Sequence, residues 1–144
     1  ELPSDGRITI VDENGNAKKL EKASTEGITG NYRSSEGGTG LDVWGTRAKW
    51  MNLFGRIGEE KISIAICDHP DNINYPTYWH ARGYGLFSAN PLGVRDFTNK
   101  KEGLNLSLET GKSITFKYRI VVGSGVHFSD AELNTTTEDF AKLY

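Results

Sequence analysis

Turn signals interrupt this sequence so often that only short strands fit between them. Runs of alternating or β-branched apolar residues recur, and each is bounded by glycine, proline or asparagine. The turn signals include Asn14-Gly15, the glycine cluster of residues 34–40, and Asn90-Pro91. The runs lie at residues 6–12, 17–23, 46–55, 60–68, 77–88, 104–109 and 113–123. With 17 glycines and no alternation of strands with helices, the pattern predicts an all-β fold, an antiparallel β-sandwich of roughly eight to ten strands.

Two local patterns refine this expectation at the ends of the chain. Asn14-Gly15 stands between two strand-like runs and predicts a β-hairpin with a primed turn. The sequence SDAELNTTTEDFAKLY, residues 129–144, is the one helix-like stretch and predicts a short C-terminal helix. Thr135 to Thr137 are the candidate caps of that helix.

Length and composition restrict the class of protein. The 144 residues suit one domain, residues 1–144. The 17 basic and 19 acidic residues give a net charge of −2 without a concentrated basic face, which argues against nucleic acid as a partner. No apolar run approaches the roughly 20 residues that cross a bilayer, so no membrane association is expected. The single cysteine, Cys67, ends a strand-like run and is expected to be a small buried apolar residue.

Polar and aromatic side chains are concentrated in residues 66–93, which hold two of the three histidines and five aromatic rings. Pro70 is expected to end the strand before it. A continuous strand over residues 77–88 would place His80, Arg82 and Tyr84 on one face, because side chains alternate along a strand. A face with an imidazole, a guanidinium and a phenol is not typical of a core, so we predict that it binds a ligand.

The three histidines carry different expectations. Arg82 on the same face as His80 would favour the neutral imidazole, which is the form that acts as a base or a ligand. His69 is explained as well by backbone capping in a loop as by function, and His127 is expected to be an ordinary surface residue. Among the aromatic residues, Trp44 and Trp50 are expected in the core, whereas Trp79 fits either core or rim.

Two carboxylates could act with these histidines. Asp68 adjoins His69, and Glu36 lies in a flexible glycine-rich loop that could approach a ligand, although a solvated loop acid explains Glu36 as well. A metal site from Asp68, His69 and His80 would use acceptable ligands, but the spacing does not favour it. The sequence therefore predicts neither a metal nor a cofactor.

Three segments, in this order, also resemble a known family: SSEGGTGLDVWGTRAKWMNLFGRI, ISIAICDHPDNINYPTYWHARGYGLFSANPLG and GKSITFKYRIVV. Residues 34–122 resemble the C-terminal half of the soluble bacterial PmoA-like family, whose name refers to methane oxygenase. The resemblance implies a partial sandwich, similar in plan to the galactose-mutarotase-like supersandwich. It also implies that the chain is the C-terminal half of a larger domain, or a family member without the N-terminal strands. Methane oxidation is not implied, because the sequence offers neither a membrane span nor copper ligands.

The resemblance associates the chain with bacterial carbohydrate metabolism, and the residues agree with that ligand class. Aromatic faces stack on the C–H surfaces of sugars, while planar polar groups bond to their hydroxyls. The matched family positions include Glu36, Arg47, Asp68, His69, Asn72, Trp79, Arg82, Tyr84 and Asn90. The candidate ligand-binding residues are Arg82, Tyr84, Trp79, Asn72, Glu36, Arg47 and Asn90. The candidate catalytic residues are His80, His69 and Asp68, which would act as acid and base.

Other functions fit the sequence too. A noncatalytic sugar-binding module needs the same rings without an acid–base pair, and a structural or protein-interaction domain would use the rings as an interface. An open sheet edge would template pairing, so we expect a second copy, as a homodimer, or a missing N-terminal half to cover it. The sequence does not indicate the compartment, and a periplasmic or secreted location is compatible with it.

Overall fold

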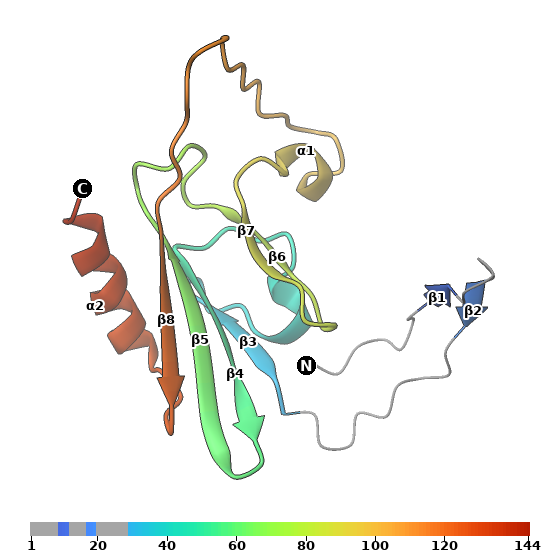
Figure 1. Ribbon diagram of the computed structural model, residues 1–144, viewed down its shortest axis with the longest axis vertical. Coiled ribbons are helices and arrows are strands. Elements are labelled where there is room, and N and C mark those ends of the chain that lie inside the picture. Colours follow the sequence, from blue (N-terminus) through green and yellow to red (C-terminus); the bar gives the residue numbers. More distant parts are fainter. Residues whose placement is uncertain (1–8, 12–16, 20–28) are drawn as a thin grey trace.

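The computed structural model describes residues 29–144 and, in the N-terminal part, the backbone of β1 (Thr9–Val11) and β2 (Ala17–Lys19). The other strands are β3 (Asn31–Ser34), β4 (Trp50–Ile57), β5 (Glu60–Asp68), β6 (Tyr78–Ala81), β7 (Phe87–Asn90) and β8 (Tyr118–Ser124). The helical elements are the 3-10 helix η1 (Gly40–Val43), α1 (Val94–Phe97) and α2 (Asp130–Ala141). Antiparallel sheets and a short C-terminal helix confirm an all-β, sandwich-like fold (Figure 1).

A four-stranded antiparallel sheet forms the centre of the molecule, in the order β3-β4-β5-β8. Strands β4 and β5 pair in register from Trp50↔Cys67 to Ile57↔Glu60, and the tight turn between them uses Gly58 at φ 59°. A positive φ is easily adopted by glycine, which explains why the chain reverses at this residue. The predicted run at residues 60–68 coincides with β5.

The two faces of this sheet carry different layers. Met51 points toward the β6–β7 hairpin and packs in a core cluster with Tyr32 and Trp79. Its neighbour Trp50 points the opposite way and packs with Leu133 of α2. Consecutive strand residues alternate between faces, so β4 divides the core into a hairpin layer and a helix layer (Figure 1).

The C-terminal helix is present, but its cap is not the predicted one. Ser129 is the N-cap residue: its Oγ accepts from the Glu132 backbone N–H at 3.3 Å, and Glu132 accepts from the Ser129 backbone N–H at 2.8 Å. Thr135 to Thr137 lie inside the helix. The prediction followed the threonine cluster, whereas the reciprocal capping box satisfies two free amides at once.

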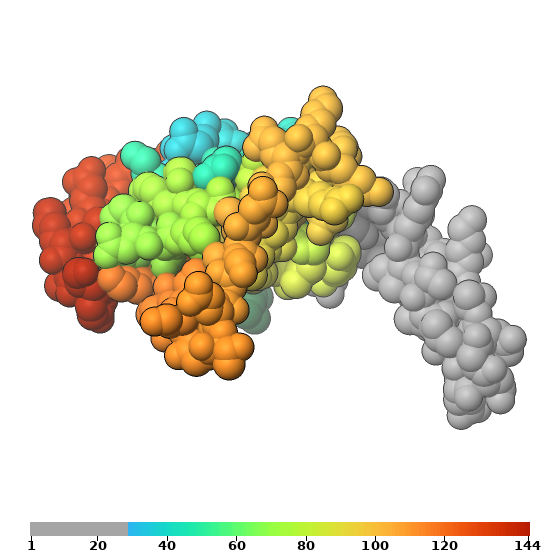
Figure 2. Space-filling model, turned by 90° about the horizontal axis from the view of Figure 1, so that it is seen from above, coloured from blue at the N-terminus to red at the C-terminus, as the bar shows by residue number. Residues whose placement is uncertain are grey.

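Three of the predicted strand runs differ in the structure. The run at residues 77–88 divides into β6 and β7, because residues 82–86 form a turn closed by a bond from the Arg82 N–H to the Leu86 carbonyl at 2.8 Å. Residues 104–109 form no strand, and the last run begins as a strand only at Tyr118. The stretch leading into β8 projects from the body (Figure 2). Alternation alone did not reveal that these residues lack a pairing partner.

The N-terminal hairpin is confirmed as a pair of strands. Strands β1 and β2 pair antiparallel, from Thr9↔Lys19 to Val11↔Ala17, while the predicted turn at Asn14-Gly15 lies outside the described residues. Among the described residues, no helix combines the length and apolar character needed to cross a membrane.

Candidate functional site

Asp68, a predicted catalytic residue, lies in a buried hydrogen-bond network at the end of β5. Its Oδ1 accepts from Asn72 Nδ2 at 2.7 Å, and its Oδ2 accepts from the Thr77 backbone N–H at 2.8 Å. Burial raises the pKa of the Asp68 carboxyl, and the bonds from Asn72 and Thr77 oppose that shift. Asn72 also bonds the backbone of Lys117 through both amide atoms, at 2.6 and 2.7 Å. The network therefore fastens the loop after β5 to the start of β8.

His69, the second predicted catalytic residue, is enclosed beneath the C-terminal helix. Its Nδ1 accepts from the Asp71 backbone N–H at 3.1 Å, and its ring meets the edge of Phe140 with centroids 5.0 Å apart. The side chain is buried. This placement agrees with the capping interpretation, since one ring nitrogen bonds the loop backbone and the ring packs in the core.

The predicted face of His80, Arg82 and Tyr84 is not continuous, because β6 ends at Ala81. His80 remains on the strand, whereas Tyr84 is exposed in the turn that follows. The Arg82 guanidinium lies over the ring of Trp44, 4.2 Å from the centroid, and the ring of His80 meets the same tryptophan at 6.5 Å. Trp44, expected in the core, is partly exposed. These residues form a surface group, Trp44–His80–Arg82, that contacts elements different from those around His69.

The remaining predicted residues mostly hold the scaffold. Trp79 is buried and donates its Nε1–H to the Ala48 carbonyl at 2.9 Å, which makes it a core residue. Arg47 donates to the carbonyls of three consecutive loop residues, 74 to 76, at 2.9 to 3.2 Å. Asn90 is half-buried in β7 opposite Tyr78. His127 is exposed, and its Nε2 lies 2.8 Å from the Gly55 carbonyl, apart from the other histidines.

A polar cleft lies where the glycine-rich loop, the start of β4, the loop after β5 and α2 come together. Its volume is about 380 Å³. Of the residues predicted for catalysis or ligand binding, only Glu36 lines this cleft. The lining residues are Ser35, Glu36, Lys49, Trp50, Tyr75, Asn134, Thr137, Glu138 and Ala141. The cleft thus combines two carboxylates, an amine, an amide and a phenol around a tryptophan.

Hydrogen bonds fix several groups of this cleft before any ligand arrives. The Oγ of Ser35 donates to Glu36 Oε1 at 3.0 Å and accepts from the Lys49 backbone N–H at 2.8 Å. Where α2 contributes to the lining, Trp50 Nε1 donates to Asn134 Oδ1 at 2.8 Å, which leaves the Asn134 amide nitrogen to donate elsewhere. A fixed Glu36 and a fixed Asn134 face the same space.

Tyr75 lines the cleft, and the charge of the buried Asp68 carboxylate acts on its phenol. Burial, followed by the negative charges of Asp68 and Glu36, raises the pKa of the Tyr75 phenol above its usual value. The phenol therefore stays protonated near neutral pH and can donate a hydrogen bond. Arg47 holds the loop that carries this residue through the carbonyls of Asn74 and Tyr75.

Sequence reasoning missed most of the cleft because its walls are distant in the chain. Lys49 lies within the predicted strand run of residues 46–55. Tyr75 lies in the polar and aromatic segment of residues 66–93, and that composition was the signal that could have selected it. Asn134 and Glu138 belong to α2, whose position against β4 depends on tertiary packing. In the part of the chain that the structure describes, no three side chains of His, Cys, Asp or Glu gather as metal ligands.

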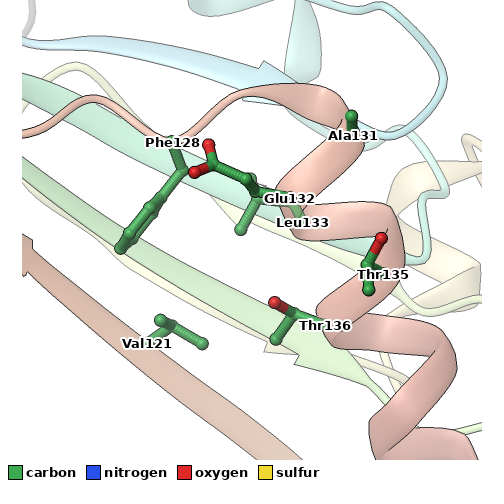
Figure 3. Close-up of a pocket in the computed structure, with 7 residues that line it drawn as sticks. All are labelled: Val121, Phe128, Ala131, Glu132, Leu133, Thr135 and Thr136. Atoms are coloured by element: carbon green, nitrogen blue, oxygen red, sulfur yellow. The ribbon is translucent and has the colours of Figure 1, made fainter.

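A second hollow, of about 520 Å³, lies between β8 and α2 and is mostly apolar (Figure 3). Its lining residues are Val121, Phe128, Ala131, Glu132, Leu133, Thr135 and Thr136. Glu132 is the one charged group in this lining, and it already bonds Ser129 in the helix cap. The apolar hollow therefore offers fewer directed polar contacts than the cleft.

Comparison with known proteins identifies a family but no characterised relative. No curated protein and no solved structure matches the chain significantly. The family of unknown function DUF6807 matches residues 12–138, which include every described element from β3 to β8 and most of α2. Because this match covers most of the sequence, the chain belongs to the DUF6807 family.

Proposed function

We propose that the polar cleft binds a small, neutral, polyhydroxylated molecule, a carbohydrate or a close chemical relative. The lining of the cleft is the observation that carries this proposal: carboxylates, an amine, an amide and a phenol surround about 380 Å³. Small-molecule sites have volumes of roughly 300–1,000 Å³ and a few directed polar groups. A ring of hydroxyls requires such donors and acceptors on several sides.

The charges of the lining favour a neutral ligand over an anion. Glu36 and Glu138 contribute −2 and Lys49 contributes +1, which leaves −1 around the cleft. An anionic ligand would meet net repulsion there. Tyr75 and Asn134 supply neutral donors, while the two carboxylates accept hydrogen bonds from hydroxyl groups.

The resemblance described from the sequence, as distinct from the DUF6807 match, supports the same ligand class. The resemblance of residues 34–122 to the soluble PmoA-like family implied an association with carbohydrates, and Glu36 is common to that resemblance and to the cleft. The acid–base set Asp68, His69 and His80 remains a prediction from sequence. We propose binding rather than catalysis, because His69 and His80 contact different elements and Asp68 is already bonded on both oxygens.

The proposal is tested by titrating isotope-labelled protein with neutral monosaccharides and disaccharides, and with a uronic acid as the anionic comparison. Chemical-shift changes are expected at residues 35–36, 75 and 134–138 with the neutral sugars. Glu138→Gln and Tyr75→Phe should each weaken binding about tenfold, the effect of losing roughly one directed hydrogen bond of 1.4 kcal/mol.

The neighbouring residue provides a matched control. Asp139 pairs with Lys142 at 3.0 Å and does not line the cleft, so Asp139→Asn should leave the affinity unchanged. Arg82→Ala tests the surface group Trp44–His80–Arg82 as the competing site. If Arg82→Ala abolishes sugar binding while Glu138→Gln does not, the ligand sits on that group and our assignment to the cleft is wrong.

A further inference from the structure

Part of one face of the central sheet, over β5 and β8, is apolar and exposed. Ile120 and Val122 of β8 point away from α2, because the residue between them, Val121, packs against the helix layer. They are 66% and 68% exposed. Their cross-strand neighbours on β5 are Ile66 and Ile64, which also face away from α2. We call this surface the aliphatic stripe; it consists of Ile57, Ile62, Ile64, Ile120 and Val122.

The β6–β7 hairpin layer covers only the part of this face that β3 and β4 form. Leu53 and Ile66 pack against the cluster that contains Trp79, so the cover extends over β3 and β4 and ends at β5. Beyond it, β8 is the last strand of the sheet among the described elements. An exposed apolar face along an edge strand, here Ile120 and Val122 of β8, is a surface that proteins normally cover.

The chain enters the sheet on the same face as the stripe. A Cβ at Gly55 would lie 3.0 Å from the Gly30 Cα, so the backbone at residue 30 passes over Gly55. Gly55 shares its face with Leu53 and Ile57, since strand residues two apart point the same way. Thr29 is held there as well, because its Oγ1 accepts from the Arg56 N–H at 2.7 Å. Thr29 and Gly30 therefore lie on the stripe's side of the sheet.

We propose that the N-terminal segment of the chain, residues 1–28, docks through its β1–β2 hairpin on the aliphatic stripe and closes the sandwich. Strands β1 and β2 pair with each other and join neither of the other sheets. A two-stranded hairpin is marginally stable alone and gains stability by packing an apolar side on another surface. In an extended strand, residues two apart in the sequence, such as Ile8 and Ile10 of GRITIVD, would share one side.

The connection is long enough for this docking. Residues 20–28 join β2 to the described chain and span up to about 30 Å when extended. β8 lies two strands from β4, about 10 Å away. The stripe is also aliphatic throughout, so it matches an isoleucine-bearing strand better than a charged or aromatic partner.

Thiol cross-linking of the full-length chain tests the proposal. Ile10→Cys in β1 is combined with Val122→Cys in the stripe, and a short bifunctional thiol reagent is added to dilute protein. Cys67 should not interfere, because it is buried and burial raises the pKa of its thiol. The control pair is Ile10→Cys with Leu143→Cys, which is 55% exposed and follows α2 on the other side of the sheet. We expect a cross-link within one chain for the first pair and none for the control.

A second measurement does not depend on the reagent. Val122→Lys should release the segment and speed its proteolytic removal, whereas Leu143→Lys should not. Cross-linked dimers from the first pair would show that a second copy occupies the stripe, and would overturn the proposal. So would equal cross-linking of the two pairs, or an unchanged cleavage rate in Val122→Lys.

Discussion

Gly55 is a position where the absence of a side chain is required by the neighbouring segment that leads into β3. A Cβ there would lie 3.0 to 3.2 Å from backbone atoms of Gly30 and Thr29, none of which can move as a side chain can. Its φ is not positive, so close approach and not backbone strain accounts for glycine.

We therefore predict that Gly55→Ala lowers the free energy of unfolding by about 1–3 kcal/mol, the usual cost of overpacking. Gly103→Ala is the control, because a Cβ at Gly103 meets nothing within 4 Å. It should be neutral or slightly stabilising. Urea denaturation of both variants measures the difference, and equal stabilities would contradict this account of Gly55.

Asp68 predicts a specific pH dependence. Burial raises its pKa in the folded protein above the unfolded value of 3.8, so the folded state holds the proton more firmly. The stability that comes from this proton is complete below the unfolded pKa and is lost as the pH rises through the folded pKa. Relative to Asp68→Asn, which does not titrate, wild type should gain stability between about pH 7 and about pH 4.

Denaturation of wild type and Asp68→Asn across this range gives the difference in free energy of unfolding. Taking the difference removes the contributions of the other acids, including Asp71, whose pKa is lowered by Lys117. A difference that is constant with pH, or that shifts against wild type on acidification, would exclude a raised pKa for Asp68.

At the scale of single elements, α2 links stability to the cleft, because it supplies Asn134, Thr137 and Glu138 to the lining. Its first turn depends on the Ser129–Glu132 capping box. Ser129→Ala should cost about 1 kcal/mol and lower Tm by roughly 4 °C. Thr135→Ala is the comparison within the same helix, and it should change Tm little, since Thr135 is not a cap. Thermal melts that ranked the two variants in reverse would restore the threonine cluster as the cap.

The loop of residues 74–76 is the second element that shapes the cleft. Arg47 holds it with Nε on the Pro76 carbonyl and one terminal nitrogen on the carbonyls of Asn74 and Tyr75. Lysine cannot reproduce this fork, because its ammonium is a single point of donation. Arg47→Lys should therefore weaken ligand binding at Tyr75 clearly while lowering Tm only slightly. A variant with full affinity would show that Tyr75 is positioned without Arg47.

At the scale of the whole molecule, two core clusters share the strands β4 and β5. One contains Met51 and Trp79, and the other contains Trp50 and Cys67. Loss of either cluster would expose one face of the same strands, so we predict cooperative unfolding. Tryptophan fluorescence, which reports Trp50 and Trp79 in different layers, should give the same transition midpoint as far-UV circular dichroism. Separate midpoints would mean that the helix layer and the hairpin layer unfold independently.

Local patterns in the sequence predicted the elements whose partners are close in the chain. Strand β5 spans the same residues as the predicted run EKISIAICD. The N-terminal hairpin and the C-terminal helix are also present. Cys67 and Trp50 are buried as expected. The division of residues 77–88 into two strands was missed, because alternation continues through the turn at Arg82 and does not report where the backbone reverses.

The sequence by itself determined the all-β class and the burial of Trp50 and Cys67, because turn chemistry and the period of two act between near neighbours. Only the tertiary structure decided which polar groups meet. Asp68 and His69 became parts of a buried network, while Glu36, Tyr75 and Glu138 came to line one cleft. The reason is physical: a buried polar group must find a partner, and whether that partner is a ligand or the protein's own backbone depends on which distant segment packs against it.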